Sequence, residues 1–158
     1  MDDDYKIITI DSSYNNFINS NIYDFYMNLD EPLRNVYKIN IITILADIPI
    51  SSSNIFLPLD PIYININEYN RLISKKDNNN LYYFDSLIVE NLITSRITIK
   101  NDYNTNDNVY HLNPLEPQLK RFNIRLYDKN NELIQKSNIN RIIIKLGIYY
   151  NNKKDTRV

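Results

Sequence analysis

The chain contains the stretch Asn113-Pro-Leu-Glu-Pro-Gln-Leu-Lys-Arg-Phe-Asn-Ile-Arg-Leu-Tyr-Asp-Lys-Asn-Asn-Glu132, followed by Arg141-Ile-Ile-Ile-Lys-Leu-Gly-Ile-Tyr-Tyr150. These two segments together indicate its fold class. Phe122, Ile124 and Leu126 alternate with polar residues, and a period of two places them on one face of an extended strand. A turn rich in Asn and Asp leads to a second alternating segment. The pattern predicts antiparallel β-strands with one face on a core, entered through a loop at the two prolines.

The same alternation recurs along the whole chain, punctuated by Asn, Asp and Pro. The expected strands are Tyr5–Ile10, Ile22–Leu29, Val36–Ile48, Ile62–Glu68, Tyr82–Val89, Arg96–Lys100, Asn108–Leu112, Leu119–Asp128 and Asn140–Tyr150. Helix is scarce, with one or two turns conceivable at Glu68–Ser74. About nine short strands with almost no helix predict a β-sandwich or barrel.

The segment Val36–Ile48 is apolar on both faces. Ile39 and Ile41 share one face, whereas Ile42 and Ile44 share the other. It is therefore expected to be a central strand, or to carry a bulge at which the phase switches.

Composition disfavours several function classes. The formal net charge of −1 argues against the broad basic surface of a nucleic-acid binder. No run of about 18 apolar residues occurs, so no membrane-spanning helix is expected. The absence of cysteine excludes disulfides and thiolate metal sites, and fits a reducing cytoplasm. The 158 residues are predicted to form one domain, with terminal segments 1–5 and 151–158 either disordered or ordered only on assembly.

Glycine is almost absent: the chain has one, Gly147, beside 27 asparagines. Turns that need a positive φ must therefore use Asn or Asp, the next most tolerant residues.

The residues with chemical potential lack the partners that a site needs. His111 is the single histidine, and a catalytic or metal-bound histidine requires further groups. Asp102-x-Asn104-x-Asn106 resembles the start of a calcium loop, but Asp107 stands where glycine is required. Asp85 and Glu90 could form a carboxylate pair, although nothing singles them out. We predict no catalytic residue, cofactor, metal site or small-molecule substrate, so the chain is not expected to be an enzyme.

The 14 tyrosines suit either a core or a protein interface, because the ring is apolar and the hydroxyl polar. Tyr149 and Tyr150, at the end of the last expected strand, are the predicted interface residues.

The stretch quoted first resembles the C-terminal half of small single jelly-roll capsid proteins of the nucleocytoplasmic large DNA viruses, the giant-virus group. In that family a proline-bearing loop precedes Leu-x-x-Leu-x-Ile-x-Leu-x-Asp-x-x-Gly and a final apolar strand, to which Leu119–Asp128 and Ile142–Tyr150 correspond. Ile8–Ser13 resembles the family's opening strand and Asp-Ser-Arg turn, with serine in place of the arginine. Phe25–Ile39 resembles the strands that follow. In the turn after Leu119–Asp128, Asn130 or Asn131 stands where the family usually has glycine.

The resemblance implies one jelly roll of about eight antiparallel strands in two sheets. It also implies a structural virion protein, foremost a penton: a homopentamer at the five-fold vertices of an icosahedral capsid, in contact with the major capsid protein. Such a protein would be located in the virion and assembled in the host cytoplasm. One alternative is a minor capsid protein beneath or between the major capsomers. An alternative of another class is a carbohydrate-binding β-sandwich module, since lectin domains share the jelly-roll plan.

Overall fold

The computed structural model describes residues 4–49, 60–70, 72–76, 79–88, 96–99 and 109–152. Its strands are β1 (Asp4–Asp11), β2 (Asn16–Phe17), β3 (Asp24–Asp47), β4 (Pro61–Ile66), β5 (Leu72–Lys76), β6 (Asn79–Tyr83), β7 (Asp85–Ile88), β8 (Arg96–Ile99), β9 (Val109–Tyr127) and β10 (Arg141–Tyr150). Two short 3-10 turns, η1 (Ser12–Tyr14) and η4 (Lys136–Asn138), lie between strands.

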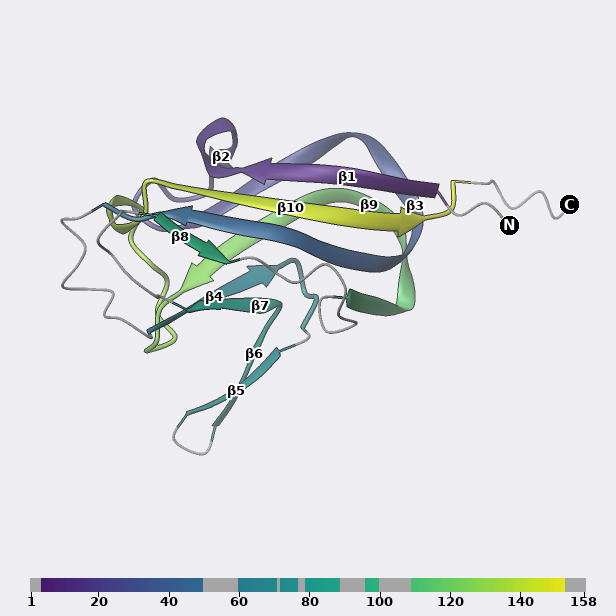
Figure 1. The fold of residues 1–158 in the computed structure, drawn as a ribbon. Coiled ribbons are helices and arrows are strands. Elements are labelled where there is room, and N and C mark those ends of the chain that lie inside the picture. Colours follow the sequence, from purple (N-terminus) through teal and green to yellow (C-terminus); the bar gives the residue numbers. More distant parts are fainter. Residues whose placement is uncertain are drawn as a thin grey trace, which may run out of the picture.

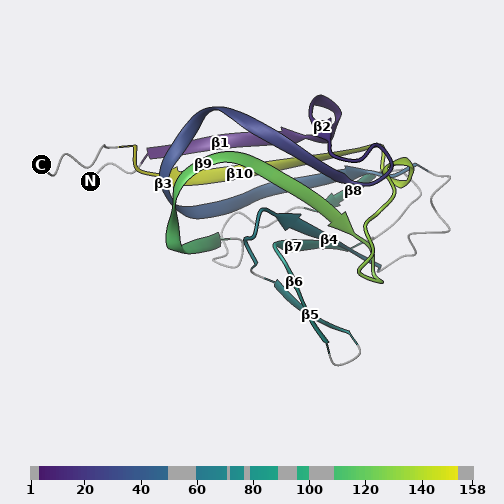
Figure 2. The same cartoon turned by 180° about the vertical axis from the view of Figure 1, so that it is seen from behind.

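β3 belongs to two layers because its two halves pair with different neighbours. Its second half pairs with β10 and β8, and β10 pairs with β1; these strands form the first layer. Its first half pairs with β2 and β9, while β4 joins β9 to β7; these form the second layer. Figures 1 and 2 show β3 and β9 as long ribbons that curve around one end of the molecule. The hydrogen-bonded sheet is consequently continuous, with eight antiparallel strands.

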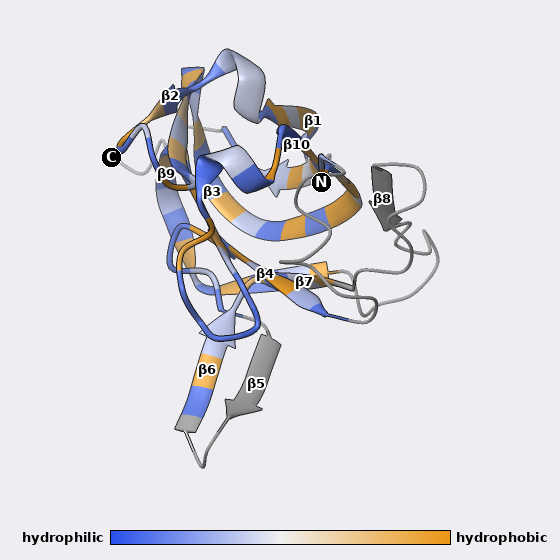
Figure 3. Ribbon diagram, turned by 90° about the vertical axis from the view of Figure 1, so that its left-hand side faces the viewer, coloured by the Kyte–Doolittle hydropathy of each residue, from blue (hydrophilic) through white to orange (hydrophobic). Residues whose placement is uncertain are grey.

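The core lies between the two layers and confirms the predicted all-β class, with a jelly-roll-like arrangement. Alternate side chains of the strands that line the core face inward, and hydrophobic and polar bands alternate along the ribbons of Figure 3. The first layer contributes Ile8, Ile10, Ile39, Ile41, Ile44, Ala46, Ile142, Ile144, Leu146 and Ile148. The second contributes Phe25, Ile62, Ile64, Ile66, Leu87, Phe122, Ile124 and Leu126.

The bulge expected within Val36–Ile48 is present. Lys145 pairs with Thr43, but the next residue, Leu146, pairs with Ile41, so Ile42 is the extra residue. The insertion switches the phase, and Ile41 and Ile44 both face the core. The segment is also central, because it pairs with a strand on either side.

Two expected interruptions are absent. The expected strands Ile22–Leu29 and Val36–Ile48 are joined in one strand, β3. The proline loop is wrong as well, because β9 runs through both prolines and joins Asn108–Leu112 to Leu119–Asp128. The register of β3 against β9 shifts between Asn28 and Leu33 and again between Val36 and Lys38. Both prolines lie where β9 pairs with β3 and not with β4, which pairs only with residues 124–127. Proline, which lacks an N–H donor, is tolerated where a strand is paired on one side.

The helical turns considered at Glu68–Ser74 are also absent. A hydrogen-bonded turn covers Asn67 and Glu68, and β5 then pairs with β6 as a separate hairpin. This hairpin extends away from the two layers in Figure 1. The expected strand Tyr82–Val89 is divided at Phe84 between this hairpin and β7.

Asparagine takes the backbone positions for which glycine is usually required. Among the described residues, those with positive φ are Asn35 at 51°, Asn67 at 50° and Asn131 at 62°. Asn131 lies in the turn after β9, where Asn130 or Asn131 is expected to replace a glycine. The prediction from glycine-poor composition is therefore confirmed.

Candidate functional site

The outer side of the first layer carries an aromatic group that we call the tyrosine face: Tyr5, Ile7, Tyr37 and Tyr149. Tyr5 of β1 pairs directly with Tyr149 of β10, and their ring centroids are 4.7 Å apart. The ring centroid of Tyr37 lies 6.3 Å from that of Tyr149. Tyr5 is 45% exposed and Ile7 51% exposed, so part of this apolar surface faces solvent. An exposed cluster of aromatic and aliphatic side chains is typical of a protein-binding surface.

Polar groups at the tyrosine face hold it in place. The ammonium group of Lys38 lies 4.1 Å from the ring centroid of Tyr149, a cation–π contact. The pKa of the Tyr5 hydroxyl is raised, chiefly by burial and secondarily by Tyr149. Gly147 lies beneath the Tyr5 ring, because a Cβ at that position would overlap the ring's outer atoms. The only glycine of the chain is therefore explained by space and not by its φ angle.

The two predicted interface residues lie on opposite sides of β10. Tyr149 belongs to the tyrosine face, whereas Tyr150 is partly buried and packs against the core. Strand alternation is the reason, since neighbouring side chains point to opposite faces. Next to them, the Asn151 N–H donates to the Arg34 carbonyl at 3.0 Å, and the Arg34 N–H donates to Asn152 Oδ1 at 3.1 Å. These bonds tie the end of β10 to the curved part of β3.

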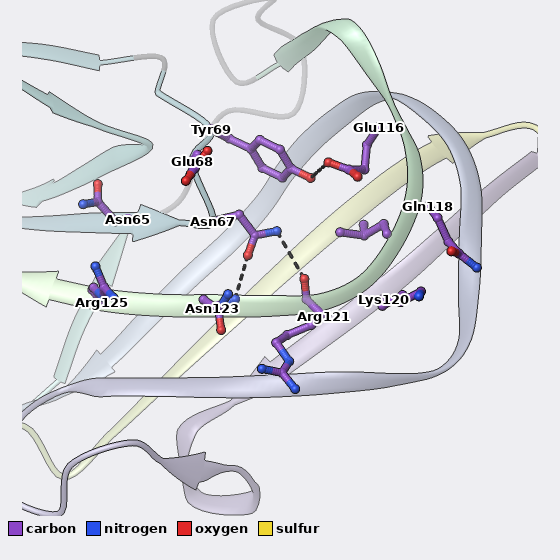
Figure 4. A pocket seen from close by; sticks show the side chains of 11 residues that line it. Asn65, Asn67, Glu68, Tyr69, Glu116, Gln118, Lys120, Arg121, Asn123 and Arg125 are labelled. Atoms are coloured by element: carbon purple, nitrogen blue, oxygen red, sulfur yellow. Dashed lines mark hydrogen bonds between the residues drawn. The ribbon is translucent and has the colours of Figure 1, made fainter.

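The outer side of the second layer carries a polar groove of about 490 Å³. It lies where β9 passes the end of β4 and the following turn, and Figure 4 shows it from close by. Its lining consists of Asn65, Asn67, Glu68, Tyr69, Glu116, Gln118, Leu119, Lys120, Arg121, Asn123 and Arg125. Hydrogen-bond donors and acceptors are mixed throughout, and neither charge sign dominates. The groove therefore suits a polar ligand better than an apolar one.

Asn67 forms the centre of this groove and continues the β4–β9 ladder with its side chain. The Asn123 N–H donates to Asn67 Oδ1 at 2.7 Å, and Asn67 Nδ2 donates to the Arg121 carbonyl at 3.2 Å. The hydroxyl of Tyr69 donates to Glu116 Oε2 at 3.3 Å. Burial, opposed by a hydrogen bond to Asn67, raises the pKa of Tyr69 to about 12. The groove is thus held in shape by its own contacts.

A third polar cluster lies at the other end of the first layer and is structural. Asp11 accepts from Ser13 N–H at 3.0 Å and forms a two-bonded ion pair with Arg141. Arg141, followed by Ser13, lowers the pKa of Asp11, while burial acts in the opposite direction. Ser12 is buried, accepts from the Ile142 N–H at 2.9 Å and bonds the Tyr23 hydroxyl at 3.2 Å. The Asp-Ser pair therefore connects β1 to β10 and to Tyr23, which immediately precedes β3.

The remaining residues considered from sequence do not come together. His111 is exposed on β9, opposite Lys38 of β3. Asp85 accepts from the Ser86 N–H, and its suggested partner Glu90 lies outside the described residues. The resemblance to a calcium loop at residues 102–107 also falls outside them. The described residues include no group of three His, Cys, Asp or Glu side chains placed to hold a metal ion. The described residues include no helix that is long and apolar enough to cross a membrane.

Comparisons with known proteins give a likeness in structure but none in sequence. No family model matches the chain, and no curated protein matches it. Among solved structures, the crystal structure of the mavirus penton protein is similar over 91% of this chain and 92% of that one. The TM-score is 0.35 and the sequence identity 11%, a level at which the likeness assigns no function to this chain.

Proposed function

We propose that this chain is a structural virion protein: a penton that forms a homopentamer at the five-fold vertices of a giant-virus capsid. The sequence resemblance to small single jelly-roll capsid proteins motivates the proposal, and the all-β, jelly-roll-like fold agrees with it. The observation that carries it is the tyrosine face, an exposed aromatic and aliphatic surface on a rigid strand ladder. In this proposal the neighbours include the major capsid protein, and the protein assembles in the host cytoplasm before it enters the virion.

The tyrosine face is suited to contact with a second copy of the chain. Tyrosine is enriched in protein interfaces because a large rigid ring loses little conformational entropy while its hydroxyl remains hydrogen-bonded. Tyr149 is held between Tyr5, Tyr37 and the Lys38 ammonium group, so little ordering is needed on binding. A ring of five requires a head-to-tail contact, in which this face meets a different surface of the next copy.

The experiment is light scattering of the purified chain over a concentration series. A pentamer would have five times the 18.9 kDa mass of the chain. Ile7→Lys should prevent or strongly weaken assembly, because the new charge would be desolvated in the contact. Ile18→Lys is the matched control, since Ile18 is 58% exposed but lies outside the tyrosine face. Tyr149→Ser tests the central ring of the face.

The outcomes separate the readings. A pentamer that Ile7→Lys dissociates and Ile18→Lys leaves intact would support both the penton and the face. A pentamer insensitive to Ile7→Lys and Tyr149→Ser would assign the contact to another surface. A strict monomer at every concentration would contradict the pentamer in solution and favour the minor capsid protein.

A further inference from the structure

The polar groove on the second layer has features of a binding site that the capsid proposal does not use. It lies on the outer side of the layer opposite to the tyrosine face, so a pentamer built on that face does not require it. Its volume of about 490 Å³ is within the range of about 300–1,000 Å³ found for small-ligand sites. Ligand binding in the groove is therefore independent of the oligomeric state of the protein.

One hydrogen-bond acceptor in the groove has no partner among the described residues. Asn65 Oδ1 is a buried acceptor that has no hydrogen-bond partner among the described residues, and Asn65 lines the groove. Buried polar atoms are nearly always partnered, so an orphan next to an open groove is a place where a ligand can donate. An N–H or O–H group satisfies this atom, whereas an anion does not.

A charged hydrogen-bond donor, Arg125, stands beside that acceptor. Arg125 is the register partner of Asn65 on one side and of Asp24 on the other. Its Nε lies 3.4 Å from Asp24 Oδ2, and Asp24 raises its pKa, so the guanidinium stays charged. The Arg125 side chain is still 51% exposed toward solvent. An acceptor and a charged donor thus stand side by side, which matches a hydroxyl group that donates to one and accepts from the other.

The walls of the groove carry charges of both signs and are held by their own contacts. The lining carries two negative side chains, Glu68 and Glu116, and three positive ones. Because the charges nearly balance, the groove attracts neither anions nor cations strongly. Arg121 is fixed by a 2.9 Å bond from its Nε to Asn28 Oδ1 and lies 4.5 Å from the Tyr26 ring centroid. The Asn67 and Tyr69 contacts fix the opposite wall. A rigid groove of alternating donors and acceptors is suited to a ligand that presents many hydroxyl groups in a fixed geometry.

We propose that this groove binds a neutral oligosaccharide, with a sugar hydroxyl or acetamido N–H donating to Asn65 Oδ1 beside Arg125. On a capsid surface such a site would attach the particle to glycans. It also gives the carbohydrate-binding reading of the sequence a definite place on the molecule. The acceptor at Asn65, and not the positive charge of the arginines, determines the ligand class.

The experiment is calorimetric titration of the full chain with maltotriose, mannotriose and chitotriose, each up to about 10 mM, because sugar contacts of this size are expected to have dissociation constants near 1 mM. A sulfated heparin tetrasaccharide is the anionic comparison. Asn65→Ala should weaken binding of the preferred neutral sugar about tenfold, the effect of one lost hydrogen bond. Asn65→Asp keeps an acceptor oxygen and should retain binding within about threefold.

Asn140→Ala is the matched control, because Asn140 is an exposed asparagine that does not line this groove. All variants should show the wild-type circular dichroism spectrum. Saturable binding of a neutral sugar that Asn65→Ala weakens and Asn140→Ala does not would support the site. The proposal is overturned by no binding of any neutral sugar, by equal binding in Asn65→Ala, or by binding of the sulfated probe alone.

Discussion

Replacement of Ser12 by alanine should destabilise the protein more than replacement of Tyr23 by phenylalanine, although both changes remove the same hydroxyl–hydroxyl bond. Ser12 Oγ and the Tyr23 hydroxyl are 3.2 Å apart, and both side chains are almost fully buried. Ser12 Oγ also accepts from the N–H of Ile142, the second residue of β10. The two substitutions therefore leave different groups without a partner.

The magnitudes follow from these contacts. Tyr23→Phe removes one hydrogen bond and leaves Ser12 bonded to Ile142, so it should cost about 1 kcal/mol. Ser12→Ala leaves both the Ile142 N–H and the Tyr23 hydroxyl buried without a partner, and each orphan costs about 1–3 kcal/mol. We expect a loss of about 2–4 kcal/mol, or a Tm lower by about 2–4 °C for each kcal/mol in a domain of this size.

The assay is urea unfolding of the single variants and the double variant, followed by far-UV circular dichroism. The double variant should be no less stable than Ser12→Ala, because Tyr23→Phe then removes an orphan instead of a bond. Ser20→Ala, at an exposed serine, is the control and should change stability by less than about 0.5 kcal/mol. A Ser12→Ala variant as stable as Tyr23→Phe would refute the assigned role of Ser12 as the acceptor for β10.

Three further predictions concern single residues. Arg141 holds the pKa of Asp11 below its usual value, so the ionised carboxylate stabilises the fold above about pH 4 and loses this effect as pH falls through the lower folded pKa. In urea titrations at about pH 6 and pH 3, Asp11→Asn should therefore reduce the loss of unfolding free energy between the two pH values. Asn67→Ala should be less stable than Asn67→Gly by about 1 kcal/mol in the same assay, because both lose the amide bonds but only alanine resists a φ of 50°; equal stabilities would exclude backbone strain there. Burial raises the pKa of Tyr69 to about 12, so the neutral hydroxyl stabilises the fold below about pH 10 and this effect is lost as pH rises through the folded value. Because burial also raises the pKa of Tyr83 to about 12, Tyr69→Phe should diminish, and not abolish, the tyrosinate absorbance that develops near pH 12; an unchanged titration would contradict the assignment.

Local patterns were sufficient for the strands and for the unusual turns. Ile62, Ile64 and Ile66 are buried as their period of two predicts, and the bulge at Ile42 was foreseeable from the change of phase. Asn131 at positive φ follows from a chain that has almost no glycine. Each of these features depends on residues adjacent in sequence, so the chain itself carries the information.

Strand ends were less predictable because they depend on pairing partners. Pro114 and Pro117 are typical of a loop, yet β9 passes through both, since this part of β9 pairs with β3 and not with β4. Residues 72–76, which overlap the helical turns considered at Glu68–Ser74, form β5 because β6 lies beside them to accept and donate hydrogen bonds. The local sequence of residues 72–76 does not indicate which strand will pair with them.

The candidate sites show the same division. Tyr149 was singled out from sequence as an interface residue, but its partners Tyr5 and Tyr37 come from distant strands, and alternation turns Tyr150 to the other side. The polar groove carried no sequence signal, because its asparagines and arginines resemble any solvent-facing strand residues until β4 and β9 bring them together.

Residues close together in the chain predict the fold class, the inward faces of the strands that line the core and the use of asparagine in left-handed turns, because backbone preferences and side-chain alternation act over a few residues. Pairing between distant segments places β3 in both layers, lets Asp11 and Ser12 connect β1 with β10 and with Tyr23 just before β3, and leaves Asn65 Oδ1 without a partner among the described residues. These features depend on contacts between residues far apart along the chain, and the free energy of such contacts appears only when the strands meet.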